Sequence, residues 1–223
     1  RLEQPILEFR VFKYPLFTLT TVISIVAFIS LIGAATILPI YMQNMHHFTA
    51  FQTGLMILPG ALLMGILSPI TGKIFDKIGA KQLALIGLFL VTVTSFLYTD
   101  LDDTTPFLYL TVVYAFRMIG IACVMMPVTT AGLNVLPRVY IPHGAAMSNT
   151  LRQVCGSIGT ALLVSIMVSY SLRTSGQASL NEAMIQGVNM TFIVATVLSL
   201  IGFLLAFFIK NENEQYEEKK LEK

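Results

Sequence analysis

The sequence predicts an all-α membrane protein, a bundle of six transmembrane helices with both chain termini in the cytoplasm. Three observations predict it: the composition, the number of long apolar runs, and the distribution of basic residues between the loops. Hydrophobic residues make up 55% of the 223 residues and charged residues only 12%, and the mean hydropathy is +0.76. A soluble domain carries about 25% charged residues, so we expect the outer surface of this chain to face lipid.

Six apolar runs are each long enough to cross a bilayer, whose hydrocarbon core takes about 20 apolar residues as a helix. The fourth and fifth runs exceed one core thickness, so these helices are expected to tilt or to extend into the interface. A soluble domain of this size would have no polar surface left to cover six such runs. We place them at about 15–42, 51–74, 82–99, 106–134, 143–171 and 187–209.

Basic and non-basic loops alternate along the chain, which indicates its orientation. The first loop has no Lys or Arg, the third is purely acidic, and the fifth has Arg173 alone, offset by Glu182. The positive-inside rule places the basic segments, and with them both termini, in the cytoplasm. An even number of spans also places both termini on one side. The basic residues are Arg1, Arg10 and Lys13 in the lead, Lys73, Lys77 and Lys81 in the second loop, Arg138 in the fourth, and Lys210, Lys219, Lys220 and Lys223 in the tail.

These observations divide the chain into three parts. Residues 15–209 form the six-helix transmembrane bundle, and the charge-rich residues 210–223 form a solvated cytoplasmic tail. Residues 1–14 are expected to be a linker from a preceding membrane segment, because the chain begins at Arg1 rather than Met and has no signal-peptide pattern. We therefore expect the chain to be a piece of a longer protein.

Small and polar residues four apart mark one face of each of two runs. In the second run, Ala61 and Gly65 have this spacing, and so do Ser68 and Gly72. Helices in lipid associate through close packing of small residues and through side-chain hydrogen bonds, so we expect the second and fifth helices to be buried against protein. The third and sixth runs are more uniformly apolar and are expected to face lipid. The marked face of the fifth run comprises Ser148, Arg152, Gly156 and Thr160, with Asn149 and Gln153 beside it.

Two charges lie inside the runs, Arg117 and Arg152, and no acidic residue does. Arg117 lies roughly 16 Å into the fourth run from its outer end, too deep to snorkel easily. A charge there costs at least about 2.5 kcal/mol and usually faces a cavity or a partner. Arg117 therefore meets water or substrate, has a partner outside this chain, or is bonded to helix carbonyls. Arg152 lies roughly 12 Å from the cytoplasmic end and could snorkel there.

The sequence carries no residues for an enzyme, a cofactor, a metal or a nucleic acid. Cys123 and Cys155 lie inside apolar runs and are expected to be buried hydrophobes. His46 and His47 are adjacent in an outer loop, with no acidic or Cys ligand nearby to complete a metal site. There is no Gly-x-Ser-x-Gly, no phosphate-binding loop and no convergent carboxylate pair. The net charge of +2 is too small, and the basic residues too scattered, to indicate nucleic-acid binding.

The segment GKIFDKIGAK, residues 72–81, resembles the loop signature of the major facilitator superfamily. Gly72, Asp76, Lys77, Gly79 and Lys81 occupy the places of the signature Gly, Asp, Arg or Lys, Gly, and Arg or Lys. In that family the loop joins the second and third helices of a six-helix half on the cytoplasmic side, where the loop count also puts it. The segments PILEFRVF, PVTTAGLNVLP and NTLRQVCGSIGTALL resemble the C-terminal half of fourteen-span, EmrB/QacA-like multidrug:proton antiporters.

The resemblance implies one half of a major facilitator fold, preceded in the parent protein by about eight spans. It implies proton-coupled export of amphipathic or cationic drugs by alternating access, with the missing N-terminal half, membrane lipid, small amphipathic substrates and protons as partners. The carboxylates and the Gly-Pro motif of such antiporters lie mainly in the first half, and GSIGTALL here has no Gly-Pro. Proton coupling therefore follows from the resemblance alone, with no residue in view to carry it.

The resemblance also implies roles for two sets of residues. In the family the 72–81 loop latches one half to the other in the outward-facing state, so the partner of Asp76 would lie in the missing half; the alternative is a plain topogenic turn. Helices 1 and 4, with parts of 2 and 5, are expected to line the substrate cavity. Candidate lining residues are Tyr114, Arg117, Met118, Met125, Asn149, Arg152 and Gln153.

Two other functions stay open on the sequence. A non-transporting membrane scaffold or sensor would keep the bundle but would need no polar cavity, and Arg117 and the Asn149–Gln153 cluster count against it. A self-sufficient six-helix transporter acting as a homodimer is the other. The missing start Met and the linker-like PILEFRVF count against that reading.

Overall fold

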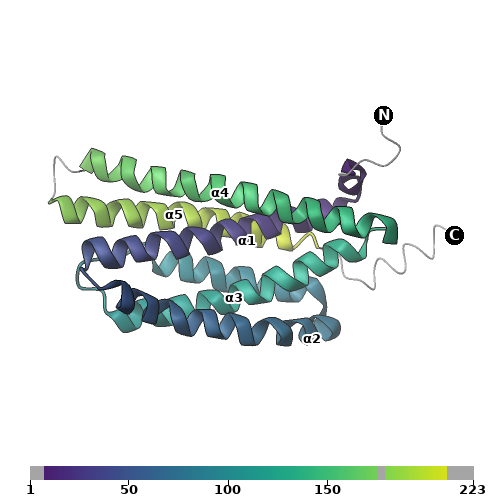
Figure 1. Cartoon of the computed structure of the whole chain (residues 1–223), viewed down its shortest axis with the longest axis horizontal. Coiled ribbons are helices and arrows are strands. Elements are labelled where there is room, and N and C mark those ends of the chain that lie inside the picture. The colour runs from purple at the N-terminus through teal and green to yellow at the C-terminus, as the bar shows by residue number, and fades with distance from the viewer. Residues whose placement is uncertain (1–7, 175–178, 210–223) are drawn as a thin grey trace.

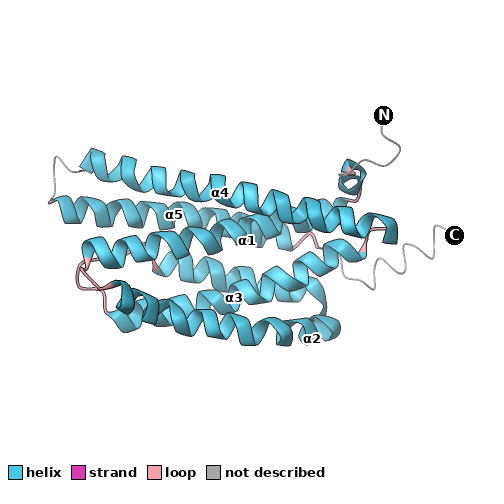
Figure 2. Cartoon of the chain, in the orientation of Figure 1, coloured by secondary structure: helices cyan, strands magenta, loops and turns pink. Residues whose placement is uncertain are grey.

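The computed structural model describes residues 8–174 and 179–209, and within them every regular element is a helix (Figure 2). The long helices run side by side along one axis (Figure 1). They are α1 (Pro15–Ile40), α2 (Ala50–Leu97), α3 (Phe107–Asn134), α4 (Ile141–Thr174) and α5 (Leu180–Ala206). All five are long and apolar enough to cross a membrane, which confirms the expected all-helical membrane bundle. The short elements are the 3-10 helices η1 (Phe9–Lys13) and η3 (Arg138–Tyr140) and the π-helical turn η2 (Tyr41–Met45).

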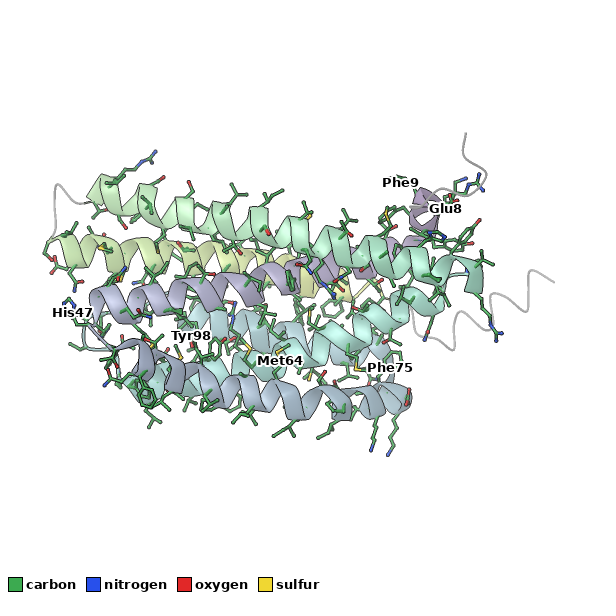
Figure 3. All side chains as sticks on the ribbon, in the orientation of Figure 1. Glu8, Phe9, His47, Met64, Phe75 and Tyr98 are labelled. Carbon is green, nitrogen blue, oxygen red and sulfur yellow. The ribbon has the colours of Figure 1, made fainter. Side chains whose placement is uncertain are left out.

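The two ends of the bundle are distinguished below by labelled residues (Figure 3). His47 lies at one end, called the His47 end, and Tyr98 lies inward from it. Glu8, Phe9 and Phe75 lie at the other, called the Phe75 end. The chain enters and leaves the described bundle at the Phe75 end, since α1 begins there and α5 ends there (Figure 1). Because the sequence predicts that both termini lie in the cytoplasm, it also predicts that the Phe75 end faces the cytoplasm.

α2 consists of two membrane-crossing segments that reverse direction at Gly79. A straight helix of 48 residues would be about 72 Å long, more than twice the hydrocarbon thickness. Gly79 instead has φ 80° and ψ 168°, a conformation that is essentially restricted to glycine. The reversal returns the chain to its starting end, so Met56 and Tyr98 share one buried cluster. The second and third predicted runs are therefore separate segments, but no loop joins them, because the polar stretch is helical on both sides of Gly79.

The last helix begins seven residues before the predicted start at 187. Ser179 caps it: its hydroxyl accepts a hydrogen bond from the Glu182 backbone amide, and the Glu182 carboxylate accepts one from the Ser179 amide. This capping box satisfies amides that would otherwise be unpaired. Hydropathy missed the first two turns because they carry polar residues.

Close backbone contact joins the second segment of α2 to α3. A Cβ placed on Gly87 would lie 2.5 Å from the Gly120 carbonyl oxygen, and one on Gly120 would lie 2.7 Å from the Gly87 oxygen. Such contacts allow no side chain, and they are typical of helix pairs packed in lipid. The pair fixes the third predicted span against α3, so this helix is partly covered by protein rather than wholly lipid-facing.

Burial differs sharply between the helices. The buried share of the most apolar stretch of each helix is 50% in α1 and in α3, but only 17% in α2 and 22% in α4. α1 and α3 thus lie at the centre of the chain, while α4 and the first segment of α2 lie at its surface. We expected these two surface helices to be buried against protein. Within the described chain they are the least buried, so any protein that covers them must lie outside it.

Candidate functional site

A line of small and polar side chains follows the exposed surface of α4. Asn149, Gln153, Ser157, Ser165 and Ser169 are all exposed. They follow one another every four residues, with Ala161 completing the series, so each lies beside the next on the helix surface. We call these six residues the polar line of α4. The Ser157 hydroxyl donates to the Gln153 carbonyl of its own helix at 3.0 Å, but a membrane-spanning helix pays heavily for side-chain amides that face hydrocarbon. We therefore expect this surface to face water or protein.

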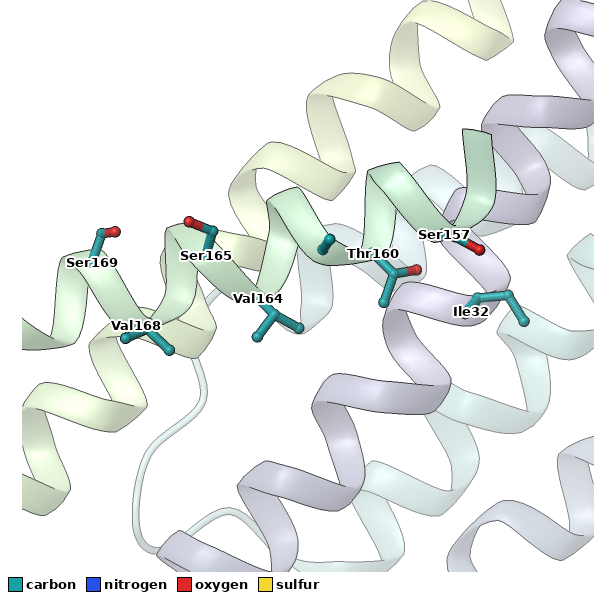
Figure 4. A pocket seen from close by; sticks show the side chains of 8 residues that line it. Ile32, Ser157, Thr160, Val164, Ser165, Val168 and Ser169 are labelled. Carbon is teal, nitrogen blue, oxygen red and sulfur yellow. The ribbon is translucent and has the colours of Figure 1, made fainter. Parts of the chain in front are cut away.

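A groove of about 730 Å³ lies between α4 and α1, along part of the polar line (Figure 4). Ser157, Ser165 and Ser169 supply hydroxyls to it, and Ile32 closes it from the α1 side. The hydroxyl of Thr160 is buried there with no hydrogen-bond partner among the described residues. The groove thus offers hydroxyl groups on an apolar floor, a combination suited to amphipathic molecules. The other lining residues are Ala161, Val164 and Val168.

Arg152 lies on α4 beside the polar line and is held against α1. Its Nη2 donates to Oδ1 of Asn149 at 3.0 Å, and its guanidinium carbon lies 5.6 Å from the centre of the Phe28 ring. Gly156 makes room for that ring, since a Cβ there would be 2.5 Å from Phe28 Cδ1. The Nε of Arg152 is buried and has no partner among the described residues. The sequence placed Arg152 roughly 12 Å from the cytoplasmic end, where it could snorkel, but these contacts hold its charge against the middle of α1.

Arg117 lies in the centre of the bundle and is fully buried. Its Nη1 donates to Ser95 Oγ at 2.7 Å, and its Nη2 donates to the Ser30 carbonyl at 2.9 Å and to Ser30 Oγ at 2.7 Å. Arg117 therefore joins α3 to α1 and to the second segment of α2. The sequence left open whether Arg117 meets water or substrate, a partner outside the chain, or helix carbonyls. In the structure it is bonded within the bundle, to one helix carbonyl and two serine hydroxyls. Its guanidinium reaches no surface of the described chain.

The other predicted cavity residues separate into buried and surface groups. Tyr114 and Met118 are buried against Gly60, where a Cβ would lie 2.7 Å from Tyr114 Cδ1 and 3.0 Å from Met118 Cγ. Met125 is half-buried, whereas Asn149 and Gln153 are exposed. Of the predicted set, the structure thus brings together on one surface only Asn149, Arg152 and Gln153.

Comparison with known proteins identifies the family. Residues 2–160 match the sequence profile of the Major Facilitator Superfamily. The chain belongs to the major facilitator superfamily. It is accordingly a multi-pass protein of the cell membrane, from a family of transporters and not of enzymes.

Several bacterial members of the superfamily are similar to this chain. YcnB of Bacillus subtilis, an uncharacterized MFS-type transporter, is 50% identical over 218 residues, which cover 98% of this chain and 46% of YcnB. The lincomycin resistance protein LmrB of the same organism is 38% identical over 94% of this chain and 45% of its own length. The multidrug export protein EmrB of Haemophilus influenzae is 26% identical over 72% of this chain and 32% of its own length. The chain spans about half the length of YcnB and LmrB.

The superfamily match includes the predicted latch residues, all of which lie at the Phe75 end. Asp76, Lys77 and Lys73 are exposed or partly exposed on the last turns before Gly79. A groove of about 440 Å³ opens beside Asp76 and Lys73, between α2 and the end of α3 near Asn134. Gly72 packs near Met126, whose Cε would lie 3.4 Å from a Cβ at that position. The segment is therefore a helix end with one charged face, not an irregular loop.

A hydrogen-bonded cluster at the His47 end was not anticipated from the sequence. The Tyr41 hydroxyl donates to the Asp102 carbonyl, and His46 Nε2 lies 2.8 Å from that hydroxyl and 2.9 Å from that carbonyl. The Asn189 amide exchanges two hydrogen bonds with the Leu101 backbone, at 2.8 and 3.1 Å. These bonds tie the connection before α3 to η2 and α5. No cluster of three or more metal-ligating side chains occurs among the described residues, and the contacts of His46 serve this connection.

Proposed function

We propose that this chain forms one half of a proton-coupled exporter of amphipathic or cationic drugs that works by alternating access. One observation carries the proposal: the polar line of α4 lies exposed on a helix that crosses the membrane. Lipid cannot satisfy the exposed side-chain amides of Asn149 and Gln153, but a water-filled substrate passage can; the Ser157 hydroxyl already donates to the Gln153 carbonyl of its own helix. The relatives LmrB and EmrB are named for lincomycin resistance and multidrug export, which supports drugs as the substrates.

The rest of the protein covers the two surface helices in this proposal. A Cβ placed on Gly54 or Gly65 of α2 would meet no atom of the described residues within 4 Å, so another helix can approach this face closely. The other half of the transporter packs here and leaves the α1–α4 groove open to the passage. Asn149, Arg152 and Gln153 contact substrate, while Arg117, Tyr114 and Met118 support the lining from behind. The Phe75 end faces the cytoplasm.

Proton coupling requires groups that this chain lacks within its spans. All acidic residues lie near or beyond the ends of the apolar runs, so the carboxylates that carry protons belong to the remaining part of the transporter. This half then contributes the substrate surface and the Asp76 latch.

Drug accumulation in cells tests the proposal. We would express the full-length protein in bacteria that lack their own drug exporters, and measure accumulation of lincomycin and of a cationic dye with and without a protonophore. The expected result is reduced accumulation that the protonophore reverses. Accumulation equal to that of cells without the protein would contradict export, and export that persists with the protonophore would contradict proton coupling.

A matched pair of variants tests the role of the polar line. Ser157 and Ile158 are adjacent, and both are exposed on α4. Ser157→Val removes a hydroxyl from the groove and is expected to reduce export, whereas Ile158→Val changes an apolar surface and is expected to leave export unchanged. Equal export by the two variants at equal expression would exclude the groove as the substrate surface.

A further inference from the structure

Among the described residues in the middle of the helices, two guanidinium groups occur, and only one reaches the surface. Arg117 is sealed inside the bundle with three hydrogen bonds to Ser30 and Ser95. Arg152 has one hydrogen bond, to Asn149, and a partly exposed side chain. Its charge is therefore available to a group outside the described chain.

The contacts of Arg152 keep that charge deep in the membrane. Phe28, which supports the guanidinium, is thirteen residues after the start of α1, or about 20 Å along a helix roughly 39 Å long. An arginine that snorkelled would extend toward the nearer helix end instead. Gly156 preserves the position, because a side chain there would collide with the Phe28 ring.

The charge is not neutralised within the described chain. A cation at this depth costs at least about 2.5 kcal/mol, and one amide oxygen and one aromatic ring do not supply a counter-charge. No acidic residue lies in the apolar runs of the sequence, and the one ion pair among the described residues joins Arg10 to Glu8 at the Phe75 end. A planar guanidinium fork matches a carboxylate in a bidentate manner, and the amides of Asn149 and Gln153 add neutral donors beside it.

We infer that Arg152, with Asn149 and Gln153, forms a carboxylate-binding site inside the membrane. The inference rests on the proposed function in so far as the site lines the substrate passage. The carboxylate belongs either to the transported compound or to an Asp or Glu of the rest of the transporter. In the first case the preferred substrates are zwitterionic amphiphiles, whose cationic group lies away from Arg152.

Transport of two matched probes distinguishes these sources. The probes are a fluorescent quinolone with a free carboxylate and its methyl ester, and the full-length protein is reconstituted in proteoliposomes. Loss of a charge-assisted hydrogen bond corresponds to about tenfold or more. A substrate carboxylate predicts that Arg152→Gln reduces quinolone export by about that factor and hardly affects the ester. A carboxylate of the transporter predicts that both probes are affected alike, and that neutralising one Asp or Glu elsewhere restores export.

Variants on the same helix serve as controls. Arg173→Gln removes an exposed charge from the last turn of α4 and is expected to change neither probe. Arg152→Lys keeps the charge but loses the fork, so it is expected to fall between wild type and Arg152→Gln. Normal export of both probes by Arg152→Gln would overturn the inference.

Thermal unfolding of the purified full-length protein separates this inference from the proposed function. A substrate carboxylate predicts that the quinolone raises the melting temperature of wild type, by about 3 °C, but not that of Arg152→Gln. A carboxylate of the transporter predicts that Arg152→Gln itself melts lower and that neutralising the partner Asp or Glu restores the melting temperature, which the loss of the Asn149 and Phe28 contacts alone would not allow. Suppose that the wild-type protein exports neither probe but that one of these two changes in melting temperature is observed. The proposal of drug export is then wrong, and the inference of a carboxylate-binding site stands. If neither melting result is obtained, the site is wrong even where export is normal.

Discussion

Arg117 on α3 donates two hydrogen bonds to Ser30 on α1, one to its carbonyl and one to its hydroxyl, at 2.9 and 2.7 Å. Two residues before Ser30, the Phe28 ring receives the guanidinium of Arg152 from α4. Residues two apart point to nearly opposite sides of a helix. The middle of α1 is therefore held between two arginines, one sealed in the core and one at the surface that we assign to the substrate passage.

The bond from Arg117 to Ser95 should contribute measurably to stability. In a double-mutant cycle of Ser95→Ala and Arg117→Met, we expect a coupling of about 1 kcal/mol, the scale of hydrogen bonds between membrane helices. Unfolding of the purified protein by denaturing detergent measures it. Thr94 is the control, because its hydroxyl bonds to carbonyls of its own helix and should show no coupling to Arg117. Equal coupling for Ser95 and Thr94 would exclude a specific bond.

The reversal of α2 should depend on glycine at position 79. Its φ of 80° and ψ of 168° are unfavourable for any residue with a Cβ, at a cost of about 1–3 kcal/mol. We expect Gly79→Ala to lower the melting temperature and the yield of folded protein. Ile78→Ala, one residue earlier and in ordinary helix, should change neither by a comparable amount. A Gly79→Ala protein as stable as wild type would show that this turn is not strained.

The charge of Asp76 should affect transport but not assembly. Asp76 is exposed in the groove at the Phe75 end, where the rest of the transporter can contact it, so Asp76→Asn is expected to weaken efflux at unchanged membrane insertion. Asp103→Asn removes an exposed charge at the opposite end and should leave efflux unchanged. Normal efflux by Asp76→Asn at normal expression would reduce this segment to a topogenic turn.

The turn before α3 should be sensitive to acid. Hydrogen bonds from the hydroxyl of Thr104, and then from that of Thr105, lower the pKa of the Asp102 carboxyl from its ordinary value of 3.8. A lowered pKa in the folded state means that this stabilisation is present above the ordinary pKa and is lost as pH falls through the lowered one. The melting temperatures of wild type and Asp102→Ala are therefore expected to differ at neutral pH and to converge under acid. A difference independent of pH would contradict the role of the carboxylate.

Hydropathy and charge were sufficient to predict the helices because each span must be apolar over a whole membrane thickness. They could not predict the start of α5, where the capping box of Ser179 and Glu182 extends a helix into polar sequence. The position of Arg117 within its apolar run also predicted that it lies deep in the membrane. Its partners could not be predicted, because Ser30 and Ser95 come from helices far away in the sequence and meet it only in the folded bundle.

The candidate site was partly predictable for a similar reason. Asn149, Arg152 and Gln153 are polar residues within an apolar run, which marks them without any structure. Their spacing could not show that α4 lies at the surface of this chain, or that Phe28 and Gly156 hold Arg152 against α1. Tyr114 and Met118 also lie in an apolar helix, but the structure shows that both are buried, packed against Gly60 of α2.

Access of water to the polar line of α4 tests the central claim most directly. In full-length protein with Cys123 and Cys155 replaced by Ser, we would introduce Gln153→Cys, Ser157→Cys and, on the exposed apolar surface of α5, Val197→Cys. A water-soluble thiol reagent is expected to label the two α4 positions and not Val197→Cys, and a transported drug should slow the α4 labelling. If Gln153→Cys and Ser157→Cys are as unreactive as Val197→Cys, this face of α4 does not line a substrate passage.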